Sequence, residues 1–243
     1  MKHYGLLGKS LSHSFSKGFF TNYFLQHQID ADYSNFEISG IEEVQKILQS
    51  DLAGLNVTFP YKESIMPYLD EVTEEARIIG AVNTIQFVDG KCLGHNTDAF
   101  GFAQSIKPFF TNLHERALIF GTGGASKAVT HVLTNLGVQV YFISSSKKGA
   151  SIFSYDDLNE HMLQGCKLWV NCTPIGTYPN VTDELPIPWV QLSEDHLIVD
   201  LVYNPPKSQF LLKAKEHGAT ILNGESMLKE QALKSLEIWN GNL

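Results

Sequence analysis

Cysteine, positive charge and long apolar runs are all scarce in this sequence. The three cysteines in 243 residues are an odd number without metal-ligand spacing, which argues against a disulfide framework and a metal site. Lysine and arginine number 18 against 26 acidic residues, and the net charge of −8 argues against a nucleic-acid or anionic-membrane partner. No stretch approaches the ~18 apolar residues of a membrane span, and the N-terminus lacks the apolar core of a signal peptide. We therefore expect a soluble, cytoplasmic protein that binds neither nucleic acid nor membranes and holds no metal.

Short apolar runs alternate with amphipathic stretches along the whole chain, which is typical of βαβ units with a mainly parallel sheet. In the first half the pattern predicts strands at residues 4–7, 32–38 and 54–58 and a hairpin turning at Asp89-Gly90. It also predicts two helices, one built on Ile41, Val44, Ile47 and Leu48, the other carrying an aromatic face that belongs to the core: Phe15, Phe19, Phe20, Tyr23 and Phe24.

A second βαβ series begins near Arg116. Its predicted strands are residues 117–120, 138–143, 168–171, 197–201 and 219–222, and its predicted helices are residues 127–136 and 226–239. The chain is therefore expected to be an α/β protein with two α/β halves, divided somewhere near residues 101–115.

The first strand of the second half runs directly into a glycine-rich turn, Gly121-Thr122-Gly123-Gly124-Ala125-Ser126. Glycines at such a turn let backbone N–H groups and a helix N-terminus approach a pyrophosphate closely. A lone G-x-G could be a tight turn only, but here a strand precedes it, a helix follows and another strand comes about 20 residues on. The context predicts a dinucleotide site, although Ser126 stands where Gly or Ala is usual.

A missing carboxylate then indicates which dinucleotide is bound. NAD-binding domains place an Asp or Glu at the end of the second strand, where it binds the ribose 2′-hydroxyl. Here that strand is followed by Ser144, Ser145, Ser146, Lys147 and Lys148, and no acidic residue occurs between Arg116 and Asp156. Hydroxyl and ammonium groups suit a 2′-phosphate that a carboxylate would repel, so the sequence favours NADP.

Four short motifs stand out in the first half: residues 12–16 (SHSFS), 56–63 (NVTFPYKE), 80–84 (GAVNT) and 96–98 (NTD). Each has an ordinary explanation when taken singly. Ser14 and Ser16 could cap the following helix, and Asp98 could cap a helix beginning at Ala99. Lys62 could be a solvated lysine, and Asn83 could satisfy the backbone of a turn.

Together these motifs resemble the shikimate dehydrogenase family. That family combines a serine-x-serine loop, N-V-T-x-P-x-K, A-V-N-T and N-T-D with a later G-x-G-G-A loop, and all five occur here in that order over nearly the whole chain. The resemblance implies an NADP-dependent oxidoreductase that reduces 3-dehydroshikimate to shikimate in the biosynthesis of aromatic amino acids. It also implies an active site in a cleft between a substrate domain and a Rossmann-type domain.

The resemblance assigns roles to individual residues. Lys62 and Asp98 would form the catalytic pair, and Asp98 would also bind a hydroxyl of the small-molecule substrate. Ser14, Ser16 and Tyr203 would bind the substrate carboxylate. Ring hydroxyls would be held by Thr58, Asn83 and Gln231. The cofactor would contact Glu74, Leu201, Gly224, the turn Gly121, Thr122, Gly123, Gly124 and Ala125, and the segment Ser144, Ser145, Ser146 and Lys147, with residues 171–173 (NCT) beside the nicotinamide.

The position of Gln231 in the last helix implies a discontinuous substrate domain, residues 1–101 plus 225–243, with the NADP-binding domain at residues 102–224. Two features depart from the family: Ser145 replaces an arginine that usually binds the 2′-phosphate, and the chain stops soon after Trp239. Alternatives are a quinate/shikimate dehydrogenase that uses NAD, a non-catalytic NADP-binding sensor, and a scaffold with incidental glycines. The sequence leaves open whether the protein is a monomer or a homodimer.

Overall fold

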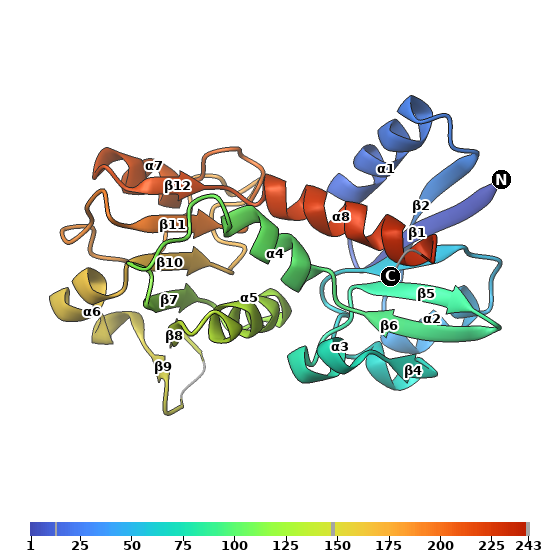
Figure 1. The fold of residues 1–243 in the computed structure, drawn as a ribbon, viewed down its shortest axis with the longest axis horizontal. Coiled ribbons are helices and arrows are strands. Elements are labelled where there is room, and N and C mark those ends of the chain that lie inside the picture. Colours follow the sequence, from blue (N-terminus) through green and yellow to red (C-terminus); the bar gives the residue numbers. More distant parts are fainter. Residues whose placement is uncertain (13, 147–148, 242–243) are drawn as a thin grey trace. The chain divides into compact units, whose positions relative to one another are not determined.

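The computed structural model of the chain describes residues 1–12, 14–146 and 149–241. The chain divides into two compact units (Figure 1), the first comprising Met1–Gly101 and Leu228–Leu243 and the second Phe102–Met227. Two helices cross from one unit to the other, α4 (Asp98–Ile106) and α8 (Glu225–Trp239). Each unit is described by itself below.

The first unit is built on a mixed sheet of six strands in the order β2-β1-β3-β5-β6-β4. The strands are β1 (Lys2–Gly8), β2 (Ala31–Glu37), β3 (Gly54–Val57), β4 (Glu71–Val72), β5 (Thr84–Val88) and β6 (Lys91–His95). β1 pairs in parallel with β2 and β3, whereas β5 pairs antiparallel with both β3 and β6. Three of the five pairings in this sheet are parallel, including that of β4 with β6, so the expected mainly parallel sheet is confirmed, while β5 runs antiparallel to both of its neighbours.

The hairpin turn itself is confirmed. Asp89 and Gly90 have φ angles of 50° and 75°, as a two-residue turn of type I′ requires, and Asp and Gly are residues that adopt such angles at low cost. The short helices of this unit are α2 (Val44–Leu48), preceded by a 3₁₀ turn at Ile41–Glu43, and α3 (Glu74–Ile79).

Helix α1 (Phe15–Gln26) carries the predicted aromatic residues, but they do not share one buried face. Phe20 and Phe24 are buried against β1, β2 and α8, whereas Phe19 and Tyr23 are only partly buried at the rim of that core. Phe15 stacks on Phe19 at 5.5 Å and Phe19 on Tyr23 at 5.9 Å. With 3.6 residues per turn, positions 15, 19 and 23 form one row and positions 20 and 24 another, so only the second row is core.

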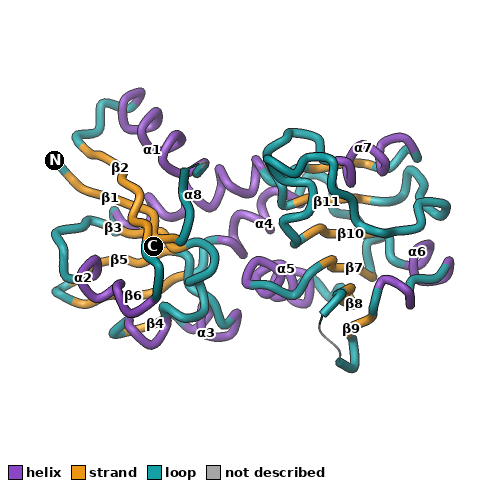
Figure 2. Tube along the Cα trace, turned by 180° about the vertical axis from the view of Figure 1, so that it is seen from behind, coloured by secondary structure: helices purple, strands orange, loops and turns teal. Residues whose placement is uncertain are grey.

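The second unit has a fully parallel six-stranded sheet in the order β12-β11-β10-β7-β8-β9, which can be followed from top to bottom in Figure 1. Its elements are the strands β7 (Arg116–Phe120), β8 (Gln139–Ile143), β9 (Ile152–Phe153), β10 (Leu168–Asn171), β11 (Leu197–Asp200) and β12 (Thr220–Leu222), and the helices α5 (Gly124–Asn135), α6 (Glu160–Gly165) and α7 (Gln209–Glu216). The strand and helix segments of this unit are coloured in Figure 2.

The central strands of the second sheet are buried on both faces. Leu118, Trp169 and Ile198 belong to the core shared with α6 and α7, and their neighbours of opposite orientation, Ile119 and Val170, are also 0% exposed. A parallel sheet covered on both faces reads as a continuous apolar run, which is why these strands were predictable. This order, with β7 central and β8 and β10 on either side, is that of a dinucleotide-binding sheet.

Within the part of the chain that the structure describes, no helix is both long and apolar enough to cross a membrane.

Candidate active site

Lys62 and Asp98 form an ion pair with 2.6 Å between Lys62 Nζ and Asp98 Oδ2. The Asp98 side chain is 2% exposed and that of Lys62 18%, so Lys62 is not the solvated lysine that it could have been. Its carbonyl also accepts from Val82 N at 2.8 Å, which fixes the turn that carries it. Charges desolvated in this way interact far more strongly than a surface pair does.

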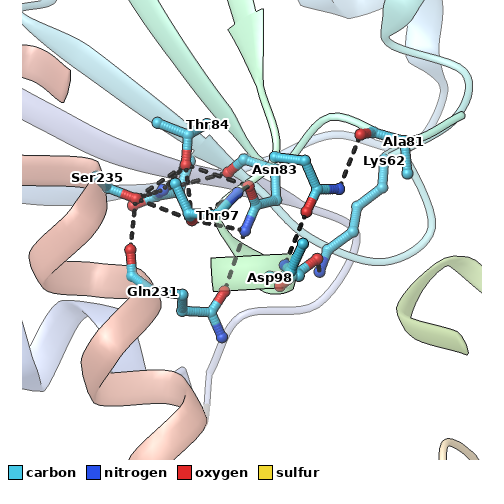
Figure 3. A network of polar contacts seen from close by, with 11 residues as sticks. Lys62, Ala81, Asn83, Thr84, Thr97, Asp98, Gln231 and Ser235 are labelled. Atoms are coloured by element: carbon cyan, nitrogen blue, oxygen red, sulfur yellow. Dashed lines mark hydrogen bonds and ion pairs between the residues drawn. The ribbon is translucent and has the colours of Figure 1, made fainter. Parts of the chain in front are cut away.

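Asp98 is the first residue of α4, but its side chain does not cap the helix. The cap is Asn96, whose Oδ1 accepts from Ala99 N at 3.1 Å, while its Nδ2 donates to the Ala81 carbonyl at 2.9 Å. The Asp98 carboxylate is therefore left to face Lys62 (Figure 3).

Asn83 has its amide orientation fixed by the backbone. Its Oδ1 accepts from the N–H of Thr97 at 2.7 Å, so its Nδ2 must be the group that donates to Thr97 Oγ1 at 3.0 Å and to Gln231 Oε1 at 3.1 Å. Gln231 accepts with its oxygen and keeps the NH₂ end of its own amide for other partners. Asn83 does satisfy a turn backbone, as one alternative held, and it also contacts a second predicted site residue (Figure 3).

Behind Asn83 lies a group of hydrogen-bonded side chains that sequence reasoning did not single out. We refer to Asn56, Thr84, Thr97 and Ser235 as the buried polar cluster, because each is at most 9% exposed. Asn56 and Thr84 occur within two of the motifs and Thr97 within a third, but nothing local to Ser235 marks it.

Ser14 occupies the N-cap position of α1 without capping it. Its side chain makes no cap hydrogen bond, and its Oγ is buried with no hydrogen-bond partner among the described residues. A buried hydroxyl without a partner costs about 1–3 kcal/mol. Ser14 therefore has a free donor for a ligand.

Ser16 lies beside Tyr33. Burial raises the pKa of Tyr33 well above its usual value, and the Ser16 hydroxyl lowers it in part. Tyr33 donates its own proton to Asn56 Oδ1 at 2.8 Å.

Thr58 follows β3 directly and is half-buried, next to the end of the parallel strand β1. A Cβ at Gly8 would lie 2.8 Å from Thr58 Cγ2, so the absence of a side chain at Gly8 leaves room for Thr58. Parallel strands end at the same edge of a sheet. Thr58 follows β3 at that edge, and Ser14 and Ser16 lie at the start of α1, which follows β1.

In the second unit, the glycine turn joins β7 to α5 as predicted. Gly121 has a φ of 96°, and a Cβ there would approach Thr173 Cγ2 to 2.9 Å, so both backbone and space favour glycine. Gly123 is the N-cap of α5, and a Cβ there would meet nothing within 4 Å. The open side, together with the first turn of a helix that contains no acidic residue, suits a phosphate group.

Ser126 stands at the last position of the glycine-rich turn, where Gly or Ala is usual, and it fits there because it is small and buried. Its side chain is 2% exposed, and its Oγ donates to the Gly123 carbonyl at 2.7 Å. Gly124, the first residue of α5, and Ala125 come between them.

Ser144, Ser145 and Ser146 follow β8. Ser144 is buried and its N–H donates to the Phe153 carbonyl at 2.9 Å, while Ser146 N donates to Ser144 Oγ at 3.3 Å. Ser145 and Ser146 are exposed, so their hydroxyls are accessible. Lys147, the lysine expected to contact the 2′-phosphate, lies outside the described residues.

Asp200, at the end of β11, joins two loops through its buried carboxylate. It accepts from Asn171 Nδ2 at 2.9 Å and from Val202 N at 3.0 Å, and from the Ser208 hydroxyl. Asn171 Oδ1 in turn accepts from Thr173 N at 2.9 Å. Burial raises the pKa of Asp200 to about 6 against these donors, which lower it.

Two of the expected cofactor positions, Leu201 after β11 and Gly224 after β12, approach each other closely. A Cβ at Gly224 would lie 2.2 Å from the Leu201 carbonyl oxygen. Only glycine therefore allows the backbone after β12 to pass this close to the backbone after β11. Tyr203, expected at the substrate carboxylate, is half-buried on the loop after β11. Glu74 is the exposed first residue of α3 in the first unit.

The chain is similar over nearly its whole length to known proteins of one family. Residues 6–85 match the family model described as the shikimate dehydrogenase substrate binding domain. A shikimate dehydrogenase (NADP⁺) of Methanosphaera stadtmanae is 34% identical over 257 residues, covering 98% of this chain and 90% of that protein. The crystal structure of shikimate dehydrogenase from Aquifex aeolicus superposes with a TM-score of 0.88 at 34% identity, over 99% of this chain and 93% of that one. The Thermus thermophilus enzyme in complex with NADP(H) and shikimate gives a TM-score of 0.87 at 29% identity, over 99% and 94%.

Proposed function

This chain belongs to the shikimate dehydrogenase family, and from that premise we propose that it interconverts shikimate and 3-dehydroshikimate with NADP. The observation that carries the proposal is the desolvated pair of Lys62 and Asp98, 2.6 Å apart. Oxidation of a ring hydroxyl removes a hydride and a proton. The reaction therefore needs one side chain that accepts the proton and a second side chain that orients the first. A lysine ammonium also stabilises negative charge developing on the reacting oxygen.

Lys62 is the residue to which we assign the proton. Its Nζ is held from one side by Asp98 and keeps some exposure, 18% for the side chain, through which a substrate oxygen can reach it. Asp98 fixes the direction of the ammonium group and has a second carboxylate oxygen for a neighbouring substrate hydroxyl. In the reverse reaction Lys62 returns the proton to the same oxygen.

Residues beyond this pair would hold the substrate. Ser14 offers its unpartnered hydroxyl to the carboxylate, joined by Ser16, and Tyr203 adds a phenol. Thr58, Asn83 and Gln231 supply neutral groups to the ring hydroxyls. Such a set rejects analogues that lack a hydroxyl, because a buried group is then left unpaired.

The residues of the second unit fit NADP. When bound, this cofactor supplies the hydride-accepting nicotinamide. The turn from Gly121 to Ala125 would hold the pyrophosphate at the start of α5, and Ser144, Ser145, Ser146 and Lys147 would surround the 2′-phosphate. Glu74, Leu201 and Gly224 would contact the remainder. Apart from Tyr203 and Glu74, we assign the substrate-binding residues to the first unit and the cofactor-binding residues to the second.

Adding shikimate with NADP or with NAD and following reduced nicotinamide by its absorbance tests the proposal directly. We expect rapid reduction of NADP and slower reduction of NAD. Bound NADP without turnover of shikimate would instead indicate a sensor, and equal use of NAD would contradict the assignment of the 2′-phosphate site.

A further inference from the structure

Ser235 on α8 is fully buried, at 0% exposure, and joins that helix to the sheet of the first unit. Its Oγ lies 2.9 Å from the Gln231 carbonyl, 3.0 Å from Asn56 Nδ2 and 2.8 Å from Thr84 Oγ1. Asn56 is on β3 and Thr84 on β5, so one hydroxyl contacts the preceding turn of its own helix and two strands (Figure 3).

Two of these hydrogen bonds have a direction determined by their partners. The Gln231 carbonyl can only accept from the Ser235 hydroxyl, and the Asn56 amide nitrogen can only donate to the Ser235 oxygen. Asn56 is fixed in the same way, because its Nδ2 also lies 3.2 Å from the Asn83 carbonyl. Its Oδ1 is therefore the end that accepts from Tyr33 at 2.8 Å. If the Asn56 amide were reversed, or if an aspartate stood at this position, an oxygen would face the Asn83 carbonyl, and both atoms are hydrogen-bond acceptors.

These bonds close a ring of four residues. Asn56 donates to the Asn83 carbonyl and to Ser235. Ser235 donates to the Gln231 carbonyl, and Gln231 Oε1 accepts from Asn83 Nδ2 at 3.1 Å. Asn83 and Gln231 are thus held to one another twice, directly through their side chains and indirectly through Asn56 and Ser235.

We propose that Ser235 is a positioning residue for substrate recognition, which fixes Gln231 against Asn83 so that both side chains meet the ring hydroxyls at a set spacing. This inference rests on the proposed function and deepens it. Ser235 touches no substrate in this assignment and acts through Gln231 and Asn56. Loss of its hydroxyl should therefore loosen the fit to the hydroxyls while the Lys62–Asp98 pair, and with it the chemical step, is maintained.

Ser235→Ala is the primary test, because Asn56 Nδ2 keeps the Asn83 carbonyl and Thr84 as acceptors. Losing one buried hydrogen bond at the site should raise KM for shikimate about 5-fold or more. We expect kcat to change less than about 2-fold and NADP affinity to be unchanged. The preference for shikimate over a ring acid lacking one hydroxyl should fall by a similar factor to the rise in KM.

Ser105→Ala is the matched control. Ser105 is also a buried helix serine, 6% exposed, and donates to the carbonyl of the preceding turn, Phe102, at 2.8 Å. Loss of the Ser105 hydroxyl should lower the melting temperature without changing KM for shikimate. If Ser235→Ala lowers only the melting temperature, or if both variants change KM alike, Ser235 has a structural role only and the proposal fails.

A second pair of variants keeps the test independent of how Ser235→Ala folds. Asn56→Asp replaces the donor at the centre of the ring, and Gln86→Glu replaces another buried amide, whose Nε2 donates to the Ile238 carbonyl on α8 at 2.6 Å. Both remove a buried donor facing a carbonyl, but only the first belongs to the ring. A rise in KM confined to Asn56→Asp supports the proposal, and equal KM values in the two variants overturn it.

The wild-type enzyme separates this inference from the proposed function. Absence of shikimate turnover by the wild type would refute the proposed function. Normal turnover by the wild type with unchanged KM in Ser235→Ala and Asn56→Asp would refute the positioning role alone.

Discussion

Replacing Lys62 by alanine should affect catalysis and stability through two separable causes. Removing the group that moves the proton should lower kcat by at least about 100-fold, the lower end of the contribution of a general acid or base, which corresponds to about 2.7 kcal/mol of activation free energy. The same change leaves the Asp98 carboxylate, 2% exposed, without its counter-ion. Breaking a buried pair in this way costs about 3–5 kcal/mol, and the 18% exposure of Lys62 places the expected loss near the lower value.

Steady-state kinetics with shikimate and NADP, combined with urea unfolding, measures both effects. The double variant Lys62→Ala/Asp98→Asn removes the unpaired charge, so it should regain much of the lost free energy of unfolding while its kcat stays low. The matched control is Lys91→Ala, which breaks a pair of the same length, 2.6 Å, to Glu71 at the surface, where the two side chains are 63% and 55% exposed. That variant should leave kcat and the free energy of unfolding nearly unchanged.

Two results would refute this reasoning. A Lys62→Ala enzyme with kcat within 10-fold of the wild type would remove Lys62 from the chemical step. A double variant no more stable than Lys62→Ala would show that the Asp98 charge is not what destabilises the single variant.

Three further predictions concern the substrate carboxylate, the cofactor and the buried acid of the second unit. Ser14→Ala and Tyr203→Phe should each weaken shikimate binding by about 1–3 kcal/mol, with NADP affinity unchanged by isothermal titration calorimetry. Lys147→Ala/Lys148→Ala should reduce the ratio of kcat/KM for NADP over NAD, and in the wild type the ratio should fall at high salt, because salt screens the attraction between a lysine and a phosphate. Burial raises the pKa of Asp200 from 3.8 to about 6, so its contribution to stability is fully present below about pH 4 and is lost as the pH rises through 6. In urea unfolding, the wild type should therefore lose about 3 kcal/mol relative to Asp200→Asn between about pH 4 and 7.

Each of these has a contrary outcome. NADP affinity that falls as much as shikimate affinity in Ser14→Ala would contradict the separation of the two binding sites. An unchanged cofactor ratio in the double lysine variant would mean that other groups hold the 2′-phosphate. A pH dependence shared by the wild type and Asp200→Asn would show that folding does not raise the pKa of Asp200.

The elements that could be predicted are those with strong local signals. The parallel strands of the second unit are continuous apolar runs. The residues of β10 were predicted without error, because this strand is buried on both faces and its apolar run has clear ends in the sequence. β4 and β9 have only two residues each, and they exist through pairing with β6 and β8, which no local pattern reveals. The hairpin at Asp89-Gly90 accounts for the antiparallel pairing of β5 with β6, whereas the antiparallel pairing of β5 with β3 has no local signal in the sequence.

The candidate site divides in the same way. Lys62, Asn83 and Asp98 belong to motifs, and the ion pair and the contact with Gln231 are consistent with the roles expected for them. Ser235 could not have been found, since a serine within a helix has no local signature and its partner Asn56 is 179 residues away in the sequence. The residues that position a site act through distant contacts, so they become visible only when the folded chain brings them together.

An overall net charge of −8 does not prevent this chain from binding an anionic dinucleotide, because binding depends on charge within about 10 Å. The segment from Arg116 to Asp156 contains no acidic residue, and it includes the glycine turn, the start of α5 and the serines after β8. The N-terminus of α5 adds the positive end of a helix dipole to exposed backbone N–H groups. The helix end and the lack of acidic residues within this segment favour the binding of a phosphate group there. Because Ser145 replaces the arginine that is usual at this position, the preference for NADP has to depend more on the local electrostatic attraction for phosphate. That attraction is screened by salt, so the preference should fall as the salt concentration rises.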